Sequence, residues 1–239
     1  MNETNQSFKI SFSGSTLKLI AIITMLIDHI ACFLGGLDFF QLELFRAVDI
    51  SITFYYLFRT IGRTAFPIFC YMIGEGYLHT KNRFRYGLAL FIGAVVSEIP
   101  FNLVFSGRLY CKEHQNVFIT LFLGYLGICC YERFRERRAI QLLTIIGLAA
   151  VTYVIHPDYS ISGYGVILLF YILRMDRLAI GIIGSLILGL RSLPAYILLA
   201  FYNGKRGWIK KPALKYAFYA FYPVHLLVLY ILQCALDIW

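Results

Sequence analysis

The sequence contains few charged residues, since only 15% of its 239 positions are Asp, Glu, Lys or Arg. A soluble domain usually carries about 25% charged and about 45–50% apolar residues. Here 59% of the residues are apolar, 17% are aromatic and the mean hydropathy is +0.70. These values exclude a water-soluble globule, and they exclude a disordered chain, which is poor in aromatic residues. We therefore divide the length into membrane spans rather than soluble domains.

Several signatures of common enzyme classes are absent. No C-x-x-C spacing occurs, and most cysteines lie in apolar runs, which indicates small buried side chains rather than a zinc site or a disulfide framework. The sequence also has no G-x-G-x-x-G, G-x-x-x-x-G-K-[ST], H-E-x-x-H or G-x-S-x-G motif. These absences argue against ATP-driven transport and zinc proteolysis, and we expect no metal. The six cysteines are Cys32, Cys70, Cys111, Cys129, Cys130 and Cys234.

Apolar runs predict an all-α fold, a polytopic membrane bundle of about nine transmembrane helices. We expect a single domain over residues 1–239, with a polar N-terminal tail at 1–16 and an amphipathic segment at 38–49 that lies along the membrane interface. Residues 178–201 predict either two short helices or a re-entrant hairpin. The other predicted spans are Leu17–Leu34, Arg59–His79, Tyr86–Phe105, Asn116–Tyr131, Ala139–Ile155, Tyr159–Leu173 and Leu214–Leu236.

Positive charge alternates between successive loops. Of the 22 Lys and Arg residues, 14 lie in four alternate loops and only 4 lie in the loops between them. Basic loops remain in the cytoplasm, so this pattern predicts nine crossings with the N-terminus in the cytoplasm. It also favours two short helices over a hairpin in residues 178–201. The net charge of +9 is then an orientation signal and not a nucleic-acid surface.

Ionisable side chains inside a bilayer cost at least a few kcal/mol each, so they are functional candidates. On the predicted topology they fall at two depths, as a site spanning both leaflets requires. The set toward the outside is Asp28, His29, Arg63, Glu98, Asn102, Asn116 and Asp158. The set toward the cytoplasm is Lys18, Glu75, Asn203, Lys205, Arg206 and His225.

The first span carries the strongest candidates. Asp28 and His29 point about 100° apart on a helix, so we expect His29 to face a cavity as a general base while Asp28 pairs with Arg63. Lys18 lies 11 residues before His29, about 16 Å along the same face, where a cation can hold a phosphate. The alternatives are polar groups satisfied by helix packing and a lysine that snorkels to the interface.

Other candidates have equally plain structural alternatives. Glu98 and Asp158 can form ion pairs that fix the bundle, or can orient His29 or receive an amine. Glu75 lies between two glycines, which suit either substrate access or close helix packing. The turn 202–207 holds two cations and two glycines, and it can cradle phosphates or act as an ordinary basic loop. His225 follows Pro223, which frees a backbone carbonyl; a packed histidine is the alternative.

These segments together resemble the TraX family, integral membrane proteins named for the conjugal-transfer protein that acetylates pilin. The resemblance covers nearly the whole chain from Leu17. The matching segments are Leu17–Ala21 with Met25 and Asp28-His29, Gly62–Phe69, Glu75-Gly76 with His79-Thr80, Ser97–Asn102, Asn116–Thr120, Asp158-Tyr159 with Gly163 and Gly165, Asn203–Gly207, and Tyr222–Leu226.

The resemblance implies N-acetylation of a protein N-terminus in the cytoplasmic membrane of a bacterium, with acetyl-CoA as the donor. The first span is more distantly similar to that of polytopic sugar O-acyltransferases, which carry Arg-x10-His. Here Lys18 replaces the arginine at the same spacing from His29. The acceptor is then an amine or hydroxyl on a pilin, a peptide, a sugar or a glycolipid.

On this hypothesis CoA phosphates meet a cytoplasmic cofactor site, and the thioester projects toward His29. The expected cofactor-binding residues are Lys18, Asn203, Lys205, Arg206 and His225. The expected catalytic residues are His29, Asp28, Arg63, Glu98 and Asn102, with a carboxylate orienting His29 and Arg63 or Asn102 stabilising the oxyanion. The expected substrate-binding residues are Glu75, Asn116 and Asp158.

Two other classes of protein fit part of the pattern. A secondary transporter also has midplane ionisable residues and broken helices, but it predicts internal repeats, which the sequence does not show. A non-catalytic assembly factor of a secretion or conjugation apparatus is the third hypothesis.

Overall fold

A computed structural model describes residues 11–47, 50–209 and 211–238. Most of the predicted N-terminal tail and positions 48–49 of the predicted interfacial segment lie outside the described residues. The elements are α1 (Gly14–Leu34), α2 (Asp38–Gln41), β1 (Glu43–Ala47), β2 (Ile50–Thr53), α3 (Phe54–Gly62), α4 (Ala65–His79), α5 (Arg83–Ser106), α6 (Val117–Arg133), α7 (Arg138–Ile155), α8 (Ser160–Ile172), α9 (Arg177–Leu188), a 3-10 turn η1 (Leu190–Ser192), α10 (Leu193–Ala200) and α11 (Pro212–Leu236).

The fold is a predominantly helical bundle, as predicted. Among the described residues, four helices are long and apolar enough to cross a membrane, namely α1, α5, α7 and α11. The prediction of about nine spans is not confirmed by these lengths. For example, α9 has 12 residues and rises about 18 Å, less than the roughly 30 Å of a hydrocarbon core.

The predicted span Arg59–His79 is wrong as one helix. The chain instead forms α3 and α4, with a break at Arg63 and Thr64. Pro67 explains the break, because a proline ring clashes with the carbonyl four residues earlier when a helix continues through it. That carbonyl belongs to Arg63, and Pro67 is instead accommodated in the first turn of α4.

The segment 38–49 is not one continuous amphipathic element. It forms the single-turn helix α2 and the strand β1, which pairs antiparallel with β2. The Phe39 ring stacks on that of Phe54 at 4.5 Å between centroids and fixes the start of α3. Leu42 and Phe45 remain exposed, so the interfacial position of this segment stays a prediction.

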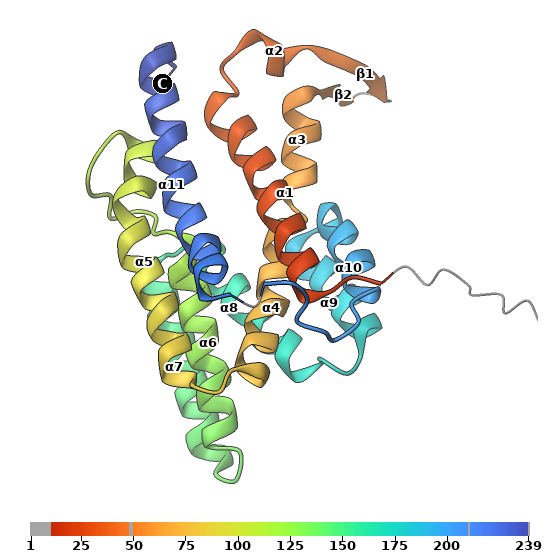
Figure 1. The fold of residues 1–239 in the computed structure, drawn as a ribbon, viewed down its shortest axis with the longest axis vertical. Helices are drawn as coiled ribbons and strands as arrows, with labels where there is room; N and C mark the ends of the chain where they lie inside the picture. The colour runs from red at the N-terminus through yellow and green to blue at the C-terminus, as the bar shows by residue number, and fades with distance from the viewer. Residues whose placement is uncertain (1–10, 48–49, 210, 239) are drawn as a thin grey trace, which may run out of the picture.

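Figure 1 shows the helices in two groups, with α1, α3, α4, α9 and α10 on one side and α5 to α8 on the other. α11 joins the groups because it packs against both α1 and α5. α4 contacts α1, α6 and α8 and is the most central helix of the bundle. In contrast, only Gln141 and Thr152 of α7 are buried. In a membrane, most of the apolar surface of α7 would therefore face lipid.

The cysteines are all free, as the sequence indicates, but they are not uniformly buried. Cys70 is buried, whereas Cys234 is exposed and the other four are intermediate. The expectation of small buried side chains is therefore wrong for Cys234, which lies on the last two turns of α11.

Close packing of α3 on α1 depends on Gly62. A Cβ atom at this position would overlap the side chain of Asp28. We expect Gly62→Ala to lower the free energy of unfolding by about 1–3 kcal/mol, because a packed core does not yield to an added methyl group. The matched control is Gly147→Ala in α7, where a Cβ meets nothing within 4 Å and helix propensity favours alanine by about 0.5–1 kcal/mol. Denaturation of both variants in detergent checks this, and equal stability of the two would contradict it.

Candidate functional site

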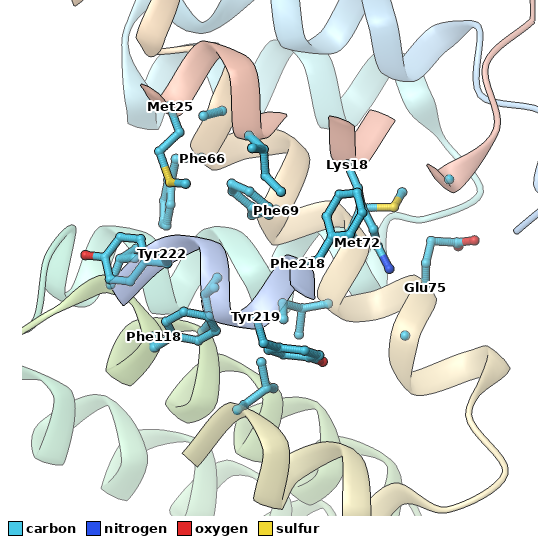
Figure 2. Close-up of a pocket in the computed structure, with 18 of the residues that line it drawn as sticks. Lys18, Met25, Phe66, Phe69, Met72, Glu75, Phe118, Phe218, Tyr219 and Tyr222 are labelled. Carbon is cyan, nitrogen blue, oxygen red and sulfur yellow. The ribbon is translucent and has the colours of Figure 1, made fainter. Parts of the chain in front are cut away.

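A cavity of about 640 Å³ lies between the two groups of helices, with walls from α1, α3 and α4 on one side and from α5, α6 and α11 on the other. Its walls include α1 residues from Gly14 to Cys32, a distance of about 27 Å along the helix axis. The cavity therefore extends along nearly the whole of α1. In Figure 2 Lys18 points into the cavity from α1 and Glu75 lies toward the same end, whereas Met25, Phe66 and Tyr222 gather toward the other.

One end of the cavity, which we call the cationic mouth, is lined by Lys18, Lys81, Arg206 and Lys215. The positive charges of Arg206 and Lys215 act directly on Lys18. Within the described residues, no carboxylate lies within 4.0 Å of these four cations. A group of like charges that are not paired with carboxylates favours an anionic ligand.

The loop after α10 holds Arg206 against the start of α1. The N–H groups of Gly14 and Ser15 donate to the carbonyls of Lys205 and Arg206 at 2.8 and 2.9 Å. The Ser15 hydroxyl also donates to the Arg206 carbonyl at 2.7 Å. These bonds satisfy N–H groups that a helix start leaves unpaired, and they explain why the turn keeps a fixed position beside Lys18.

Glu75 lies beside the cationic mouth and is held by Tyr202. The Tyr202 hydroxyl donates to Glu75 Oε2 at 2.7 Å, and His79 Nδ1 is 3.8 Å from the same oxygen. Burial and the hydrogen bond to Glu75 raise the pKa of the Tyr202 phenol above its usual range, so this phenol remains a donor at neutral pH. Glu75 lines the cavity wall.

The middle of the cavity is apolar. Its walls include Phe69, Met72, Phe118 and Phe218. Met and Phe side chains at this depth provide a flexible, water-poor passage for an uncharged molecule. The cavity is therefore charged at its ends and apolar between them.

At the other end, which we call the distal end, Asp28 pairs with Arg59 and not with Arg63. Arg59 donates to Asp28 Oδ2 at 2.7 Å, and the two side chains are only 20% and 16% exposed. The predicted Asp28–Arg63 pair is therefore wrong. The reason is the tight crossing at Gly62, which brings the last turns of α3 against Asp28. Asp28 Oδ1 has no partner among the described residues.

Arg63 instead donates to the Tyr159 hydroxyl at 3.4 Å. Tyr159 stacks on Phe66 with 3.6 Å between ring centroids and has a left-handed backbone at φ 61°. A non-glycine residue in this region costs about 1 kcal/mol or more, which the stacking and the hydrogen bond offset. The turn places both Asp158 and Tyr159 on the cavity wall.

His29 lines the cavity. His225 lies beside it, although the sequence predicted His225 at the cytoplasmic end. His29 Nδ1 lies 2.7 Å from His225 Nε2, and the rings are nearly parallel, with centroids 4.9 Å apart. The predicted placement of His225 with the cytoplasmic set is therefore wrong. The packing of α11 along α1 brings together residues that lie 196 positions apart.

The hydrogen bonds around this pair define its tautomers. His225 Nδ1 lies 2.8 Å from the Phe221 carbonyl, and a carbonyl only accepts, so we assign the proton of neutral His225 to Nδ1. His225 Nε2 is then an acceptor and His29 Nδ1 must donate to it. The lone pair of His29 is thus on Nε2, which no described residue bonds. A histidine, and not the predicted carboxylate, orients His29.

Three predicted site residues form a separate polar network. Asn116 caps α6 by accepting from the Phe118 N–H at 3.0 Å and donates to Glu98 Oε2. Asn102 donates to Glu98 Oε1 at 3.3 Å and to the Leu109 carbonyl at 3.4 Å. None of Glu98, Asn102 and Asn116 lines the cavity. The structure places them away from the cavity wall, and the hydrogen bonds of Asn116 to Ala94 and Glu98 hold α5 against the start of α6.

Two predicted cofactor-binding residues also lie outside the cavity wall. Asn203 Oδ1 accepts from the Lys205 N–H at 2.9 Å, so Asn203 shapes the turn. Its neighbours Gly204 and Arg206 line the cavity, but Asn203 and Lys205 do not. Gly204 and Gly207 have φ of 72° and 84°, and this backbone turns Arg206 rather than Lys205 to the cavity.

Sequence reasoning missed Arg59, Tyr159, Lys81 and Lys215 as wall residues. Arg59 had a usable signal, because it lies one helical turn before Arg63. Lys81 and Lys215 were counted only as loop charges. Tyr159 adjoins Asp158, but nothing in the sequence indicates its contact with Arg63.

The apolar helices and the cavity with charged ends define a helical membrane protein with an internal site. A sequence model of the family described as TraX protein matches residues 13–233, so the chain belongs to the TraX family. The chain is 31% identical over 257 residues to the probable fimbrial assembly protein FimC, serogroup H1, of Dichelobacter nodosus. The alignment covers 93% of this chain and 96% of that protein. No solved structure matches.

Proposed function

We propose that this TraX-family protein is a membrane-embedded acetyltransferase. It moves an acetyl group from cytoplasmic acetyl-CoA to an amine, at the N-terminus of a pilin or other peptide, or to a hydroxyl of a sugar or glycolipid. The observation that carries the proposal is one continuous cavity in which His29, with a free Nε2, lies at the polar distal end, about 16 Å along α1 from Lys18 of the cationic mouth. The fimbrial assembly role in the name of the relative supports a pilin-related acceptor.

The cationic mouth is the donor site in this mechanism. Lys18, Arg206 and Lys215 would meet the phosphates of CoA, and the apolar middle of the cavity would hold its uncharged arm. The acetyl thioester then reaches His29 from the side of Lys18. The sequence separation of 11 residues places the two side chains about 16 Å apart along α1.

The chemical step is a direct transfer. His29 Nε2 takes a proton from the acceptor amine or hydroxyl while that atom attacks the thioester carbonyl. A tetrahedral intermediate forms, and Arg63 at the distal end is the cation that would stabilise its oxyanion. The C–S bond then breaks, and protonated His29 returns the proton to the CoA sulfur.

The topology that fits this chemistry has nine crossings of the bacterial cytoplasmic membrane, with α3 and α4 together forming one crossing. The loops 80–82, 134–137, 173–176 and 201–211 would then face the cytoplasm, where acetyl-CoA is available. This assignment follows the loop charges. It places the cationic mouth inside and the distal end outside.

The donor site is tested with two adjacent residues of one loop. Arg206→Ala should raise KM for acetyl-CoA about 10- to 100-fold, because a lost charge-assisted phosphate contact costs about 1.5–3 kcal/mol. Lys205→Ala is the matched control, since Lys205 does not line the cavity, and it should change KM less than about threefold. Acetyl-CoA-dependent thermal stabilisation in detergent is the parallel binding measurement. Equal effects of the two substitutions would reject the assignment.

An assembly factor without catalysis is the second candidate, because the name of the relative fits it directly. It predicts no stabilisation by acetyl-CoA and no change in acetylation when the gene is removed. Mass spectrometry of surface peptides from cells with and without the protein separates the two functions. A lost acetyl group identifies the enzyme, whereas unchanged acetylation with lost assembly identifies the factor.

A further inference from the structure

A second groove lies on the outside of the seam between α1 and α11. It holds about 350 Å³, and all of its wall residues are apolar. Leu19 and Ile23 on α1 belong to its walls and are 40% and 49% exposed. Both α1 and α11 are long and apolar enough to cross a membrane. The medium that fills this groove is therefore lipid hydrocarbon.

Two side chains separate this groove from the main cavity. Ile22 of α1 and Phe218 of α11 line both spaces, and Figure 2 shows Phe218 on the cavity wall near Lys18. The side-chain hydrogen bonds between α1 and α11 lie further along the helices, at His29–His225 and Gln233–Phe33. Rotation of Phe218 would therefore open the partition without breaking a hydrogen bond between described residues.

The polarity of the cavity favours this lateral route for a molecule with a hydrocarbon chain. Both ends of the cavity are charged. A hydrocarbon chain that entered through either end would first have to leave the bilayer for water, and this transfer costs about 0.8 kcal/mol per CH₂. Behind the partition the walls are apolar, with Met25, Phe69 and Met72. A chain that came through the seam would remain in apolar surroundings throughout.

We propose that the seam between α1 and α11 is a lateral window that admits one extended hydrocarbon chain from the bilayer. The acceptor is then a membrane amphiphile, whose amine or hydroxyl reaches His29 while its chain stays in the groove. A whole α-helix with side chains is about 10–12 Å wide, too wide for a partition of two side chains. The identity of the acceptor rests on the proposed acetyl transfer, but the window itself does not.

Photolabelling tests the window without any need for activity. The protein is placed in phosphatidylglycerol–phosphatidylethanolamine nanodiscs that contain a phospholipid with a diazirine at the end of one acyl chain. We expect label on lipid-facing α7 and also on Phe69 or Met72 of α4, which face the cavity. Ala217→Trp should reduce the α4 label at least about fivefold, because a packed indole leaves no path through the groove, while the α7 label stays constant.

The matched control is Val224→Trp, which adds the same side chain to α11 at a position that is 56% exposed and outside the groove. It should change neither label. An absence of label on α4, or equal α4 label in wild type and Ala217→Trp, would overturn the proposal. Label on α4 from a diazirine-bearing transmembrane peptide but not from the phospholipid would also overturn it.

A kinetic comparison separates the window from the proposed function. Ala217→Trp should slow acetylation of a long-chain alkylamine and spare a short, water-soluble amine. If both amines are slowed equally, the acceptor does not use the window. If the wild type acetylates neither amine but α4 labelling depends on Ala217, the window stands and the proposed acetyl transfer fails.

Discussion

His29→Ala should reduce acetyl transfer by about 10³-fold or more while leaving the protein folded. General-base catalysis typically raises a reaction rate about 10²–10⁴-fold. His29 lines the cavity, and its hydrogen bond to His225 leaves the Nε2 nitrogen free to act as that base. The measurement is release of free CoA thiol together with mass spectrometry of the acceptor. The substitution removes a ring that stacks on His225 but no residue of the cationic mouth, so stabilisation by acetyl-CoA should persist.

Two further histidine variants sharpen this expectation. His114→Ala is the control, because His114 is exposed in the loop before α6 and should retain full activity. His225→Gln keeps an acceptor oxygen where His225 Nε2 accepts from His29, so it should retain more activity than His225→Leu, which leaves the His29 tautomer unfixed. Nitrogen-15 NMR of His29 should show the proton on Nδ1 in the wild type. Full turnover of His29→Ala would remove the base from the mechanism.

The helices could be predicted because their signal is local. The predicted spans Ala139–Ile155 and Tyr159–Leu173 differ from α7 and α8 by one residue at each changed end. Apolar runs and basic loops define such segments without any knowledge of packing. The break at Arg63 also had a local signal in Pro67, but the long apolar run concealed it.

The site was predicted only in part because its geometry depends on contacts between distant segments. Lys18 and His29 share one helix, so their common placement on a cavity followed from spacing. The partner of His29 is on α11, and no local pattern marks it. The choice of Arg59 over Arg63 as the partner of Asp28 depends on the crossing at Gly62. Glu98 is similar in type to Glu75, yet two of its three N–H donors belong to Asn116 at the start of α6, and the third is Asn102 of α5 itself.

Arg59→Met should lower the free energy of unfolding by about 3 kcal/mol, because it leaves Asp28 as a buried charge without its partner. Asp28 Oδ2 accepts from Arg59 at 2.7 Å, and Oδ1 already lacks a partner among the described residues. Arg63 donates to Tyr159 and does not replace the lost bond. Denaturation in detergent measures the loss, and the cavity should also become less specific for its acceptor.

The control for this prediction is a surface pair on the hairpin. Arg46 and Glu43 are 3.6 Å apart, with side chains 67% and 43% exposed, so Arg46→Met should cost less than about 1 kcal/mol.

Adding Asp28→Asn to Arg59→Met removes the unpaired charge and should restore most of the stability, because the penalty comes from the carboxylate and not from lost packing. A double variant as unstable as Arg59→Met alone would show instead that the guanidinium of Arg59 stabilises the bundle through its contacts and not through Asp28.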